Sequence, residues 1–322
     1  MCEVHKDKIK DIVRNFEGKK ILVIGDMMLD HYIFGEVNRI SPEAPVPVVE
    51  VKKEISNPGG AANVVNNIKE MKGIPIPVGI IGKDREGEKL KNLLKEKGIN
   101  VEGLFETEDR PTTTKTRIIA HHQQVVRVDK EKTEIIPDAL KDKIIDFVTA
   151  LMGEIDAILF EDYDKGVIDG DLISRVKAIS VDKILVADPK YRNFFEYKGF
   201  TIVKPNRKEA EWAARKILSA DNIEEEGKSL RKVLECKALL ITMGAEGMAL
   251  FTEDGFYRIK NKAKEVYDVT GAGDTAIAAI TLSLCAGANF FEASYIGNIA
   301  AGIKVGKLGA VPVTLEEILS AL

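Results

Sequence analysis

The stretch Ile21-Leu-Val-Ile-Gly25 decides the fold class of this chain. A continuous apolar run that ends at a turn residue is typical of a strand buried on both faces of a parallel sheet. The same pattern recurs in five further runs, at residues 76–81, 157–160, 184–187, 201–203 and 238–241. Amphipathic segments of helical length separate these runs. The alternation therefore predicts a doubly wound α/β fold, in which helices flank a mostly parallel sheet.

The remaining periodicity completes the expected architecture. We expect helices near residues 7–16, 60–72, 84–97, 137–152, 169–180, 206–218, 222–235, 274–287 and 291–306. Residues 31–55 and 111–129 instead alternate polar and apolar side chains with period two, which predicts half-exposed antiparallel strands. We expect residues 1–322 to form a single domain in which these two inserted segments build a small β-sheet lid.

Composition narrows the class of partner. The 322 residues carry 47 Lys and Arg against 51 Asp and Glu, so no excess of basic residues is available for the phosphates of a nucleic acid. The longest uncharged stretch, residues 275–291, is shorter than the ~20 residues that a membrane-spanning helix needs. The three cysteines are too few for a disulfide framework. We expect a cytoplasmic protein that binds neither nucleic acid nor membrane.

The motif Asp268-Val-Thr-Gly-Ala-Gly-Asp274 is the sharpest chemical feature. Its glycines allow backbone N–H groups to approach an anion closely, and the helix expected next adds the positive end of its dipole. Asp274 would stand beside that anion, where it can accept a proton from an attacking hydroxyl. The alternative is that Asp274 only caps the helix, which is the commonest role of Asp at such a position.

Two other nucleotide motifs fit poorly. Gly271-Ala-Gly-Asp-Thr-Ala276 matches G-x-G-x-x-A, with Glu292 near the distance of a ribose-binding acid. The chain after Ala276 is too short for the rest of a dinucleotide-binding half, and Asp274 would repel a pyrophosphate. The sequence also contains no G-x-x-x-x-G-K-[ST] motif, so we expect neither NAD, FAD nor a P-loop site.

The motif at residues 268–274 resembles the C-terminal signature of ribokinase-like (PfkB-type) carbohydrate kinases, and Gly59-Gly-Ala-Ala-Asn63 resembles their N-terminal Gly-Gly motif. The chain is most similar to the D-glycero-D-manno-heptose 7-phosphate kinases. That similarity rests on Gly25-Asp-Met-Met-Leu-Asp30, Arg39-Ile-Ser-Pro-Glu-Ala-Pro-Val-Pro-Val48, Gln123-Gln124, Arg127-Val-Asp129, Asp162-Tyr163, Lys165-Gly166, Asp188-Pro-Lys190 and Val305-Gly-Lys-Leu-Gly309.

The resemblance implies a role for each matching residue. Asp274 corresponds to the catalytic base, and the amides of Gly271, Ala272 and Gly273 to the groups that hold the transferring phosphoryl group. The positions that contact sugar hydroxyls in the family correspond here to Asp26, Gly59, Gly60 and Asn63.

The nucleotide would bind near the segment Asn206-Arg-Lys-Glu209, which matches the family's N-x-x-E motif. In the family this Glu orders Mg²⁺ through water, so Glu209 is the metal candidate. Without the resemblance, Asn206 and Glu209 form a helix capping box equally well. The resemblance further assigns nucleotide contacts to Thr242, Gly244, Gly247 and Asn298.

Cations on the expected lid suggest the substrate class. Lys115 and Arg117 lie two apart on one strand and hence on one face, Arg127 lies on the next strand, and Gln124 lies between them. The alternative is an ordinary solvated strand face. The resemblance to kinases of phosphorylated sugars favours an anionic sugar, which these four side chains would bind.

We therefore expect an ATP-dependent kinase that phosphorylates the anomeric hydroxyl of D-glycero-D-manno-heptose 7-phosphate to the 1,7-bisphosphate. ATP and Mg²⁺ are implied, a monovalent cation is left open, and exposed lid edges favour a homodimer. Glu161 and Asp164 depart from the Ser and Ala that heptose kinases often carry there. The alternatives are a kinase for another sugar, sugar phosphate or nucleoside, or a sugar-sensing relative without turnover.

Overall fold

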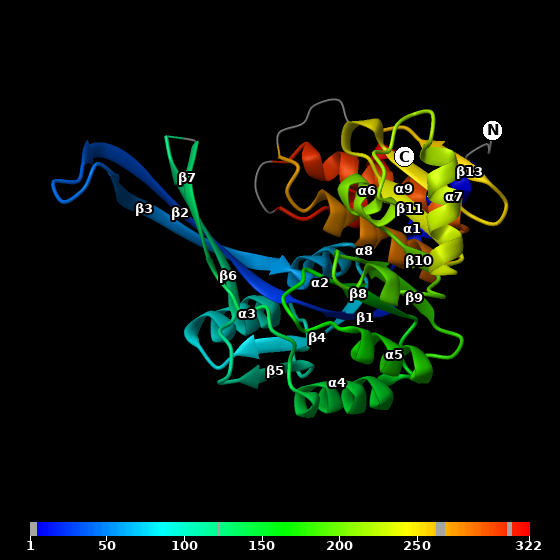
Figure 1. Ribbon diagram of the computed structural model, residues 1–322, viewed down its shortest axis with the longest axis horizontal. Coiled ribbons are helices and arrows are strands. Elements are labelled where there is room, and N and C mark those ends of the chain that lie inside the picture. Colours follow the sequence, from blue (N-terminus) through cyan, green and yellow to red (C-terminus); the bar gives the residue numbers. More distant parts are fainter. Residues whose placement is uncertain (1–4, 122, 262–267, 308–310) are drawn as a thin grey trace.

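The computed structural model describes residues 5–121, 123–261, 268–307 and 311–322. A large nine-stranded sheet forms its centre, in the order β13-β12-β11-β10-β9-β8-β1-β4-β5 (Figure 1). Its strands are β1 (Lys20–Gly25), β4 (Ile74–Gly82), β5 (Leu104–Thr107), β8 (Ala157–Glu161), β9 (Ile184–Asp188), β10 (Ile202–Val203), β11 (Ala238–Thr242), β12 (Met248–Phe251) and β13 (Phe256–Ile259).

The six apolar runs of the sequence form six neighbouring strands of this sheet, and all of them pair in parallel. This confirms the expected α/β fold. The strands that the sequence analysis did not predict are β5, β12 and β13. Each has only four residues, which is too short to show a period, and β12 and β13 extend the sheet as an antiparallel edge.

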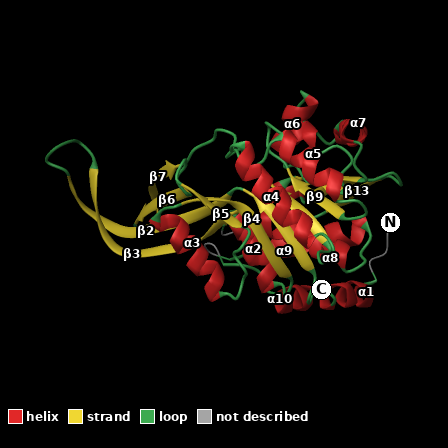
Figure 2. Ribbon diagram, turned by 90° about the horizontal axis from the view of Figure 1, so that it is seen from below, coloured by secondary structure: helices red, strands yellow, loops and turns green. Residues whose placement is uncertain are grey.

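Helices cover both faces of the large sheet. Their bounds are α1 (Lys6–Arg14), α2 (Ala61–Glu70), α3 (Arg85–Glu96), α4 (Asp138–Leu151), α5 (Gly170–Ile179), α6 (Arg207–Ala214), α7 (Ile223–Leu234), α8 (Ala272–Cys285), α9 (Phe290–Val305) and α10 (Leu315–Ala321). The helix that the sequence analysis missed is α10, which is short and begins at a capping box. Helices α1 and α10, from opposite ends of the chain, lie side by side (Figure 2).

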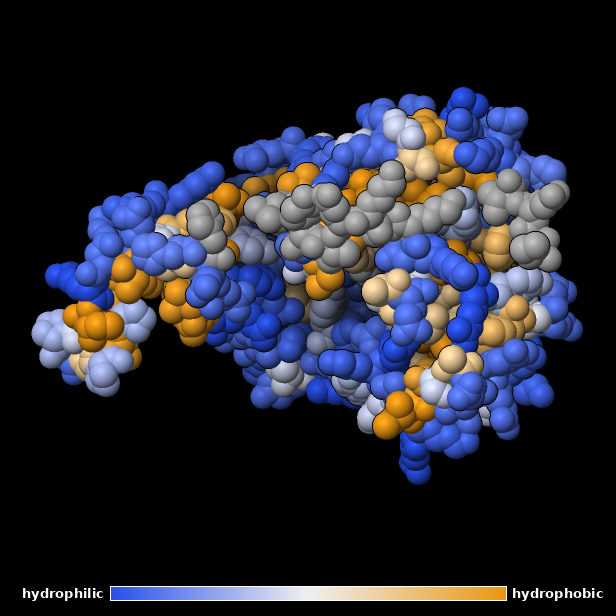
Figure 3. Space-filling view, turned by 90° about the horizontal axis from the view of Figure 1, so that it is seen from above, coloured by the Kyte–Doolittle hydropathy of each residue, from blue (hydrophilic) through white to orange (hydrophobic). Residues whose placement is uncertain are grey.

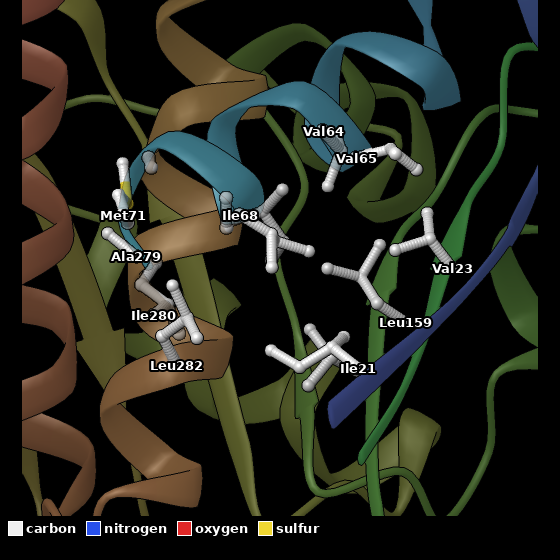
Figure 4. Packing of buried hydrophobic residues seen from close by; sticks show 14 of the residues in the cluster. Ile21, Val23, Val64, Val65, Ile68, Met71, Leu159, Ala279, Ile280 and Leu282 are labelled. Carbon is white, nitrogen blue, oxygen red and sulfur yellow. The ribbon is translucent and has the colours of Figure 1, made fainter. Parts of the chain in front are cut away.

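The two faces of β1 show how the sheet divides the core. Ile21 and Val23 pack into one apolar cluster with α1, α2, α3, α8, α9 and α10, and Figure 4 shows them facing α2 and α8. Leu22 and Ile24 belong to a second cluster with α4, α5, α6 and α7. Because successive side chains of a strand point to opposite faces, an apolar run without alternation places β1 between two helical layers.

A small sheet projects from this body. Its order is β3-β2-β6-β7, with β2 (Met27–Ile40), β3 (Pro47–Gly60), β6 (Thr113–Ala120) and β7 (Gln123–Lys130). Strands β2 and β3 form a long hairpin that extends beyond the other elements (Figures 1 and 2). The two inserted segments do form one second sheet, as expected. They do not pair only in the antiparallel sense, because β2 and β6 are parallel.

The small sheet differs from the core in its exposure. Every residue of β7 is exposed, and the far part of the β2–β3 hairpin carries the exposed apolar side chains of Ile40, Val46 and Val51 (Figure 3). The proline-rich residues 41–46 form the loop at the end of this hairpin, as the missing N–H groups of proline predict. In the described part of the chain, no helix is both long and apolar enough to cross a membrane.

Candidate active site

The candidate site lies where the parallel strands end. Asp26 follows β1, while Glu161, Asp188 and Thr242 are the last residues of β8, β9 and β11. Because the carboxyl ends of parallel strands meet at one edge of the sheet, these side chains gather there. A cavity of about 690 Å³ opens at this edge, and Asp274 in the first turn of α8 lines it together with part of α9. Its volume suits a nucleotide-sized ligand.

Asp274 is a buried carboxylate that does not cap its helix. The N-cap of α8 is Gly271, in the left-handed region with φ 74°, so the helix begins within the glycine motif rather than at Asp274 as expected. The Asp274 side chain accepts hydrogen bonds from Asn63 Nδ2 at 2.6 Å and from the Tyr163 hydroxyl at 2.9 Å. The capping interpretation of Asp274 is therefore wrong. Burial raises the pKa of Asp274, and the hydrogen bonds from Asn63 and Tyr163 act in the opposite direction.

Asn63 is held in place from α8. The Asn67 side-chain amide donates to the Asn63 backbone carbonyl at 2.8 Å, and the Thr275 hydroxyl donates to Asn67 Oδ1 at 3.0 Å. Thr275 directly follows Asp274 in the chain. Asn63, predicted to contact sugar hydroxyls, is thus connected to the carboxylate of Asp274 through its own amide and again through this short chain of hydrogen bonds.

Asp26 supports a loop instead of facing the cavity. Its carboxylate accepts hydrogen bonds from the backbone N–H groups of Tyr163, Lys165 and Val167, at 2.8, 3.1 and 3.2 Å. Burial raises the pKa of Asp26, and these three hydrogen bonds partly offset that effect. Asp26 therefore fixes the backbone of the loop that follows β8. The sugar contact of Asp26 stays a prediction.

Asp30, four residues further on, occupies the place beside the Gly-Gly motif. A Cβ atom on Gly59 would lie 2.6 Å from Asp30 Oδ2, and one on Gly60 would lie 2.6 Å from the backbone oxygen of Asp26. Both glycines thus let β3 approach β2 closely. Asp30 was quoted in the resemblance but given no role. The signal for it is its spacing, because Asp30 points to the same face of the small sheet as Lys115.

The cations of the small sheet share one face, as their spacing predicts. The Lys115 ammonium lies over the Tyr163 ring, 5.1 Å from its centroid, and burial lowers the pKa of Lys115. Arg117 Nη1 donates to Asp30 Oδ1 at 2.5 Å. Arg127 lies directly opposite Arg117 on β7, but its side chain is exposed, and Gln124 is exposed further along β7. The face therefore runs outward from Lys115, which lies over the cavity residue Tyr163, whereas these four side chains do not themselves line the cavity.

Most of the predicted nucleotide residues line the cavity. Asn206, Thr242, Gly244, Gly247 and Asn298 do so, whereas Glu209 does not. The turn 242–247 leads from β11 into β12, which is why its residues meet the carboxyl-end edge of the sheet. Helix α9 also lines this cavity. Its Asn298 amide donates to the Lys260 backbone oxygen at 2.9 Å.

Glu209 belongs to a complete capping box. Its backbone N–H donates to Asn206 Oδ1, and its Oε2 accepts from the Asn206 backbone N–H at 2.7 Å. Its other oxygen pairs with the ammonium of Lys190. The capping interpretation of Asn206 and Glu209 is thus confirmed, whereas the water-mediated metal role of Glu209 stays a prediction.

Two lysines and two further carboxylates complete the cavity. Lys204 is buried and pairs with Asp188 at 2.6 Å, and it approaches the Gly273 backbone. Glu161 is 1% exposed, and its Oε2 has no hydrogen-bond partner. Burial and the nearby Asp188 and Asp274 raise the pKa of Glu161 well above its usual range. The described residues contain no group of three metal-ligating side chains.

A buried carboxylate at a helix N-terminus, beside lysines and a nucleotide-sized cavity, is the arrangement of a phosphotransferase that acts on a hydroxyl group. The chain belongs to the pfkB family of carbohydrate kinases, which it matches over residues 18–317. Asp188, Lys190 and Lys204 are site residues to which the sequence analysis assigned no role, although each stands at the end of a predicted strand or close after it.

Relatives agree with this assignment. The chain is 44% identical to the bifunctional protein HldE of a Nitratiruptor species over 300 residues, which cover 93% of this chain and 64% of that protein. It is 42% identical to the bifunctional protein HldE of Helicobacter pylori over 303 residues, which cover 93% and 65%. The chain thus spans less than two thirds of the length of these relatives.

Solved structures share the fold. Phosphofructokinase-2 from Escherichia coli, in its tetrameric inhibited form, superposes with a TM-score of 0.78 at 16% identity, covering 94% of this chain and 98% of that one. Arabidopsis thaliana ribokinase, in complex with ribose and ATP, gives a TM-score of 0.72 at 19% identity, with the same coverage. The two proteins confirm the ribokinase-like architecture of the large and small sheets.

Proposed function

We propose that this kinase transfers the γ-phosphoryl group of ATP to the anomeric hydroxyl of D-glycero-D-manno-heptose 7-phosphate, giving the 1,7-bisphosphate. The observation that carries the proposal is the position of Asp274. Its carboxylate lines the nucleotide-sized cavity from the first turn of α8, and Tyr163, one of its two hydrogen-bond donors, lies beneath Lys115 of the small sheet.

The reaction follows from this geometry. Asp274 accepts the proton of the anomeric hydroxyl while the oxygen of that hydroxyl attacks the γ-phosphorus. The bond between the γ-phosphorus and the bridging oxygen of ADP breaks. The backbone N–H groups at the start of α8 and the ammonium of Lys204 would stabilise the negative charge that develops on the phosphoryl group, although the N–H of Ala272 here donates to the Val269 carbonyl at 3.3 Å. The resemblance assigns the former role to Gly271, Ala272 and Gly273.

The choice of a phosphorylated sugar rests on the small sheet. Lys115 and Arg117 are half-buried cations at the site end of one sheet face, and Arg127 continues the same face. A neutral sugar has no need of them, whereas a phosphate dianion is a good acceptor for guanidinium groups. The Asp30 carboxylate would accept hydrogen bonds from sugar hydroxyls, and the backbone of Gly59 and Gly60 beside it would contact the sugar.

Magnesium fits the donor set. Mg²⁺ usually keeps several waters and takes one or two carboxylates together with nucleotide phosphates. Glu161 and Asp188 line the cavity, and Glu161 has an oxygen without a partner. Glu161 and Asp188 would hold the ion, which would neutralise the charge of the phosphates when bound, and Glu209, paired with Lys190, would act on the ion only through water.

A kinase for a different sugar is the second candidate. Glu161 and Asp164 make the surroundings of Tyr163 more acidic than the heptose-kinase pattern does, which would disfavour a second anion there. A coupled ATPase assay against a panel of sugars, sugar phosphates and nucleosides separates the candidates, and ³¹P NMR of the product locates the new phosphate. Preference for a neutral sugar would refute the heptose 7-phosphate assignment.

We also propose that the protein forms a homodimer through the small sheet. Strands β3 and β7 are its edges, and β7 exposes the apolar side chains of Val125, Val126 and Val128. An exposed apolar edge strand readily pairs with another chain. Sedimentation velocity should give a dimer that Val126→Lys converts to a monomer. A monomeric parent protein would refute this proposal.

A further inference from the structure

Tyr163 lies between the small sheet and Asp274. Its hydroxyl donates to Asp274 Oδ1 at 2.9 Å, although 111 residues separate the two in the chain. The ammonium groups of Lys115, from the small sheet, and Lys190, from the loop after β9, lie 5.1 and 5.4 Å from the centroid of its ring. Neither the family match nor the resemblance gives this side chain a role.

The backbone of Tyr163 is unusually well fixed. Asp26 accepts hydrogen bonds from the backbone N–H groups of Tyr163, Lys165 and Val167. The neighbouring Asp162 accepts from Asp164 N, Asn193 Nδ2 and the Tyr197 hydroxyl, each at 2.9 Å. Asp164 has a positive φ of 57°, so the loop turns sharply just after Tyr163. Two buried carboxylates, Asp26 and Asp162, thus hold the loop from which the Tyr163 side chain contacts Asp274.

We propose that Tyr163 is a positioning residue that orients the carboxylate of Asp274, and that its ring connects Lys115 of the small sheet to this base. This inference rests on the proposed function, because it gives Tyr163 a part in the proton transfer to Asp274. With Asn63 donating to one oxygen and Tyr163 to the other, the plane of the carboxylate is defined from both sides.

The charge state of Asp274 depends on several neighbours. Burial and the charge of Asp188 favour the protonated carboxyl, and Glu161 is a further acidic neighbour. Lys204 from the end of β10 and Lys304 from α9 are the nearby cations that favour the carboxylate. A general base must be ionised before the sugar hydroxyl attacks. The Tyr163 hydroxyl therefore contributes directly to the pH range in which the enzyme works.

The test is Tyr163→Phe, which deletes the hydroxyl and keeps the ring. Without this donor the pKa of Asp274 rises, so the acid limb of the kcat/KM profile should move upward by roughly one pH unit. Activity should then fall about tenfold on that limb and stay near the parent value on the plateau, with an unchanged KM for ATP. Tyr163→Leu, which also removes the ring, should additionally raise the KM for the sugar phosphate.

Tyr197→Phe is the matched control. It also deletes one hydroxyl that donates to a buried carboxylate at 2.9 Å, but that carboxylate is Asp162, outside the cavity. It should lower thermal stability and leave the acid limb in place, because Asp164 N and Asn193 Nδ2 still donate to Asp162 and hold the loop. An unshifted acid limb in Tyr163→Phe, or a loss equal at every pH, would overturn the inference.

A second variant covers the case in which Tyr163→Phe does not fold. Site-specific 3-fluorotyrosine at position 163 makes a stronger donor of nearly the same size, so the acid limb should move downward. The carboxyl titration of Asp274, followed by ¹³C NMR without substrate and assigned with Asp274→Asn, should shift in the same directions. This readout survives even if heptose 7-phosphate is not the substrate, so failure of the proposed function and failure of this inference are distinguishable.

Discussion

The two sheets of this kinase differ in how far their side chains are exposed to solvent. The central strands of the large sheet are buried on both faces, and even the carboxylates at their ends are largely shielded from water. The small sheet has an edge strand that is exposed along its whole length and cations that lead toward the site. The large sheet therefore positions the buried carboxylates of the site, whereas the small sheet carries the cationic side chains that would recognise the substrate. Substitutions in the two sheets should therefore affect different kinetic constants.

The largest effect should come from Asp274→Asn. The amide keeps the shape of the side chain but cannot accept the proton, so kcat should fall by roughly 10²-fold or more. ATP binding, measured by calorimetry, should persist. Asp171→Asn, in the first turn of α5 and away from the cavity, is the control and should leave kcat unchanged. Near-normal turnover of Asp274→Asn would remove this residue from the mechanism.

The next effect concerns stability and compares one substitution at two places. Val186→Ala, on β9 and 0% exposed, should lower the free energy of unfolding by about 2–3 kcal/mol, because it leaves a cavity between packed layers. Val126→Ala, on β7 and 45% exposed, should change it by less than about 0.5 kcal/mol. Urea unfolding measures both, at a protein concentration low enough to keep the chain monomeric, so that the proposed dimer does not bury Val126. Equal losses under that condition would mean that the small sheet is packed within a single copy of the chain.

The same contrast explains how much of the fold could be predicted. An apolar run such as residues 21–25 has few places in a folded chain other than a doubly covered strand, so the large sheet followed from the sequence. Alternation in residues 31–55 and 111–129 predicted the second sheet, because alternation assigns side chains to faces. It does not say which strands become neighbours, and the parallel pairing of β2 with β6 was missed for that reason.

The site was predicted in the same uneven way. Asp274 could be identified because glycines and a helix start surround it in sequence. Asp26 and Asp30 lie in one motif, and only the direction that the chain takes after β1 decides that Asp26 faces loop amides while Asp30 faces Arg117. The contact of Tyr163 with Asp274 joins distant segments, so no local pattern indicates it.

A smaller effect, confined to KM, should follow changes at the small sheet. Arg117→Ala should weaken binding of the sugar phosphate by about 1.5–3 kcal/mol, the value of a hydrogen bond to a charged group, while the KM for ATP stays constant. Arg117→Lys keeps the charge but loses the planar fork and should be milder. Arg127→Ala should have a weaker effect than Arg117→Ala, because the Arg127 side chain is exposed and farther from the site.

Unphosphorylated sugars provide the control for this series. Their KM should not change in the Arg117 and Arg127 variants, since they lack the group that the guanidinium groups bind. Because Arg117 also pairs with Asp30, which would accept from sugar hydroxyls, Asp30→Asn should raise the KM for phosphorylated and unphosphorylated sugars alike, unlike the Arg117 variants. Normal binding of the sugar phosphate by both Arg→Ala variants would leave a carbohydrate kinase but exclude a phosphate site on the small sheet.

The smallest effect should come from Glu209→Gln. This substitution separates the two roles considered for Glu209, capping a helix and ordering Mg²⁺. The glutamine amide oxygen still accepts from the Asn206 N–H, so the capping box survives, while the lost pairing with Lys190 should lower stability by more than a surface ion pair would, because Glu209 is buried. If Glu209 helps to order Mg²⁺, the Mg²⁺ concentration for half-maximal activity must rise. Glu292→Gln is the matched control, because Glu292 forms the same capping box with Asn289 on α9 and also pairs with a lysine, Lys8. An identical magnesium requirement in both variants would leave Glu209 with the helix cap as its only role, and would shift the metal to the carboxylates of Glu161 and Asp188.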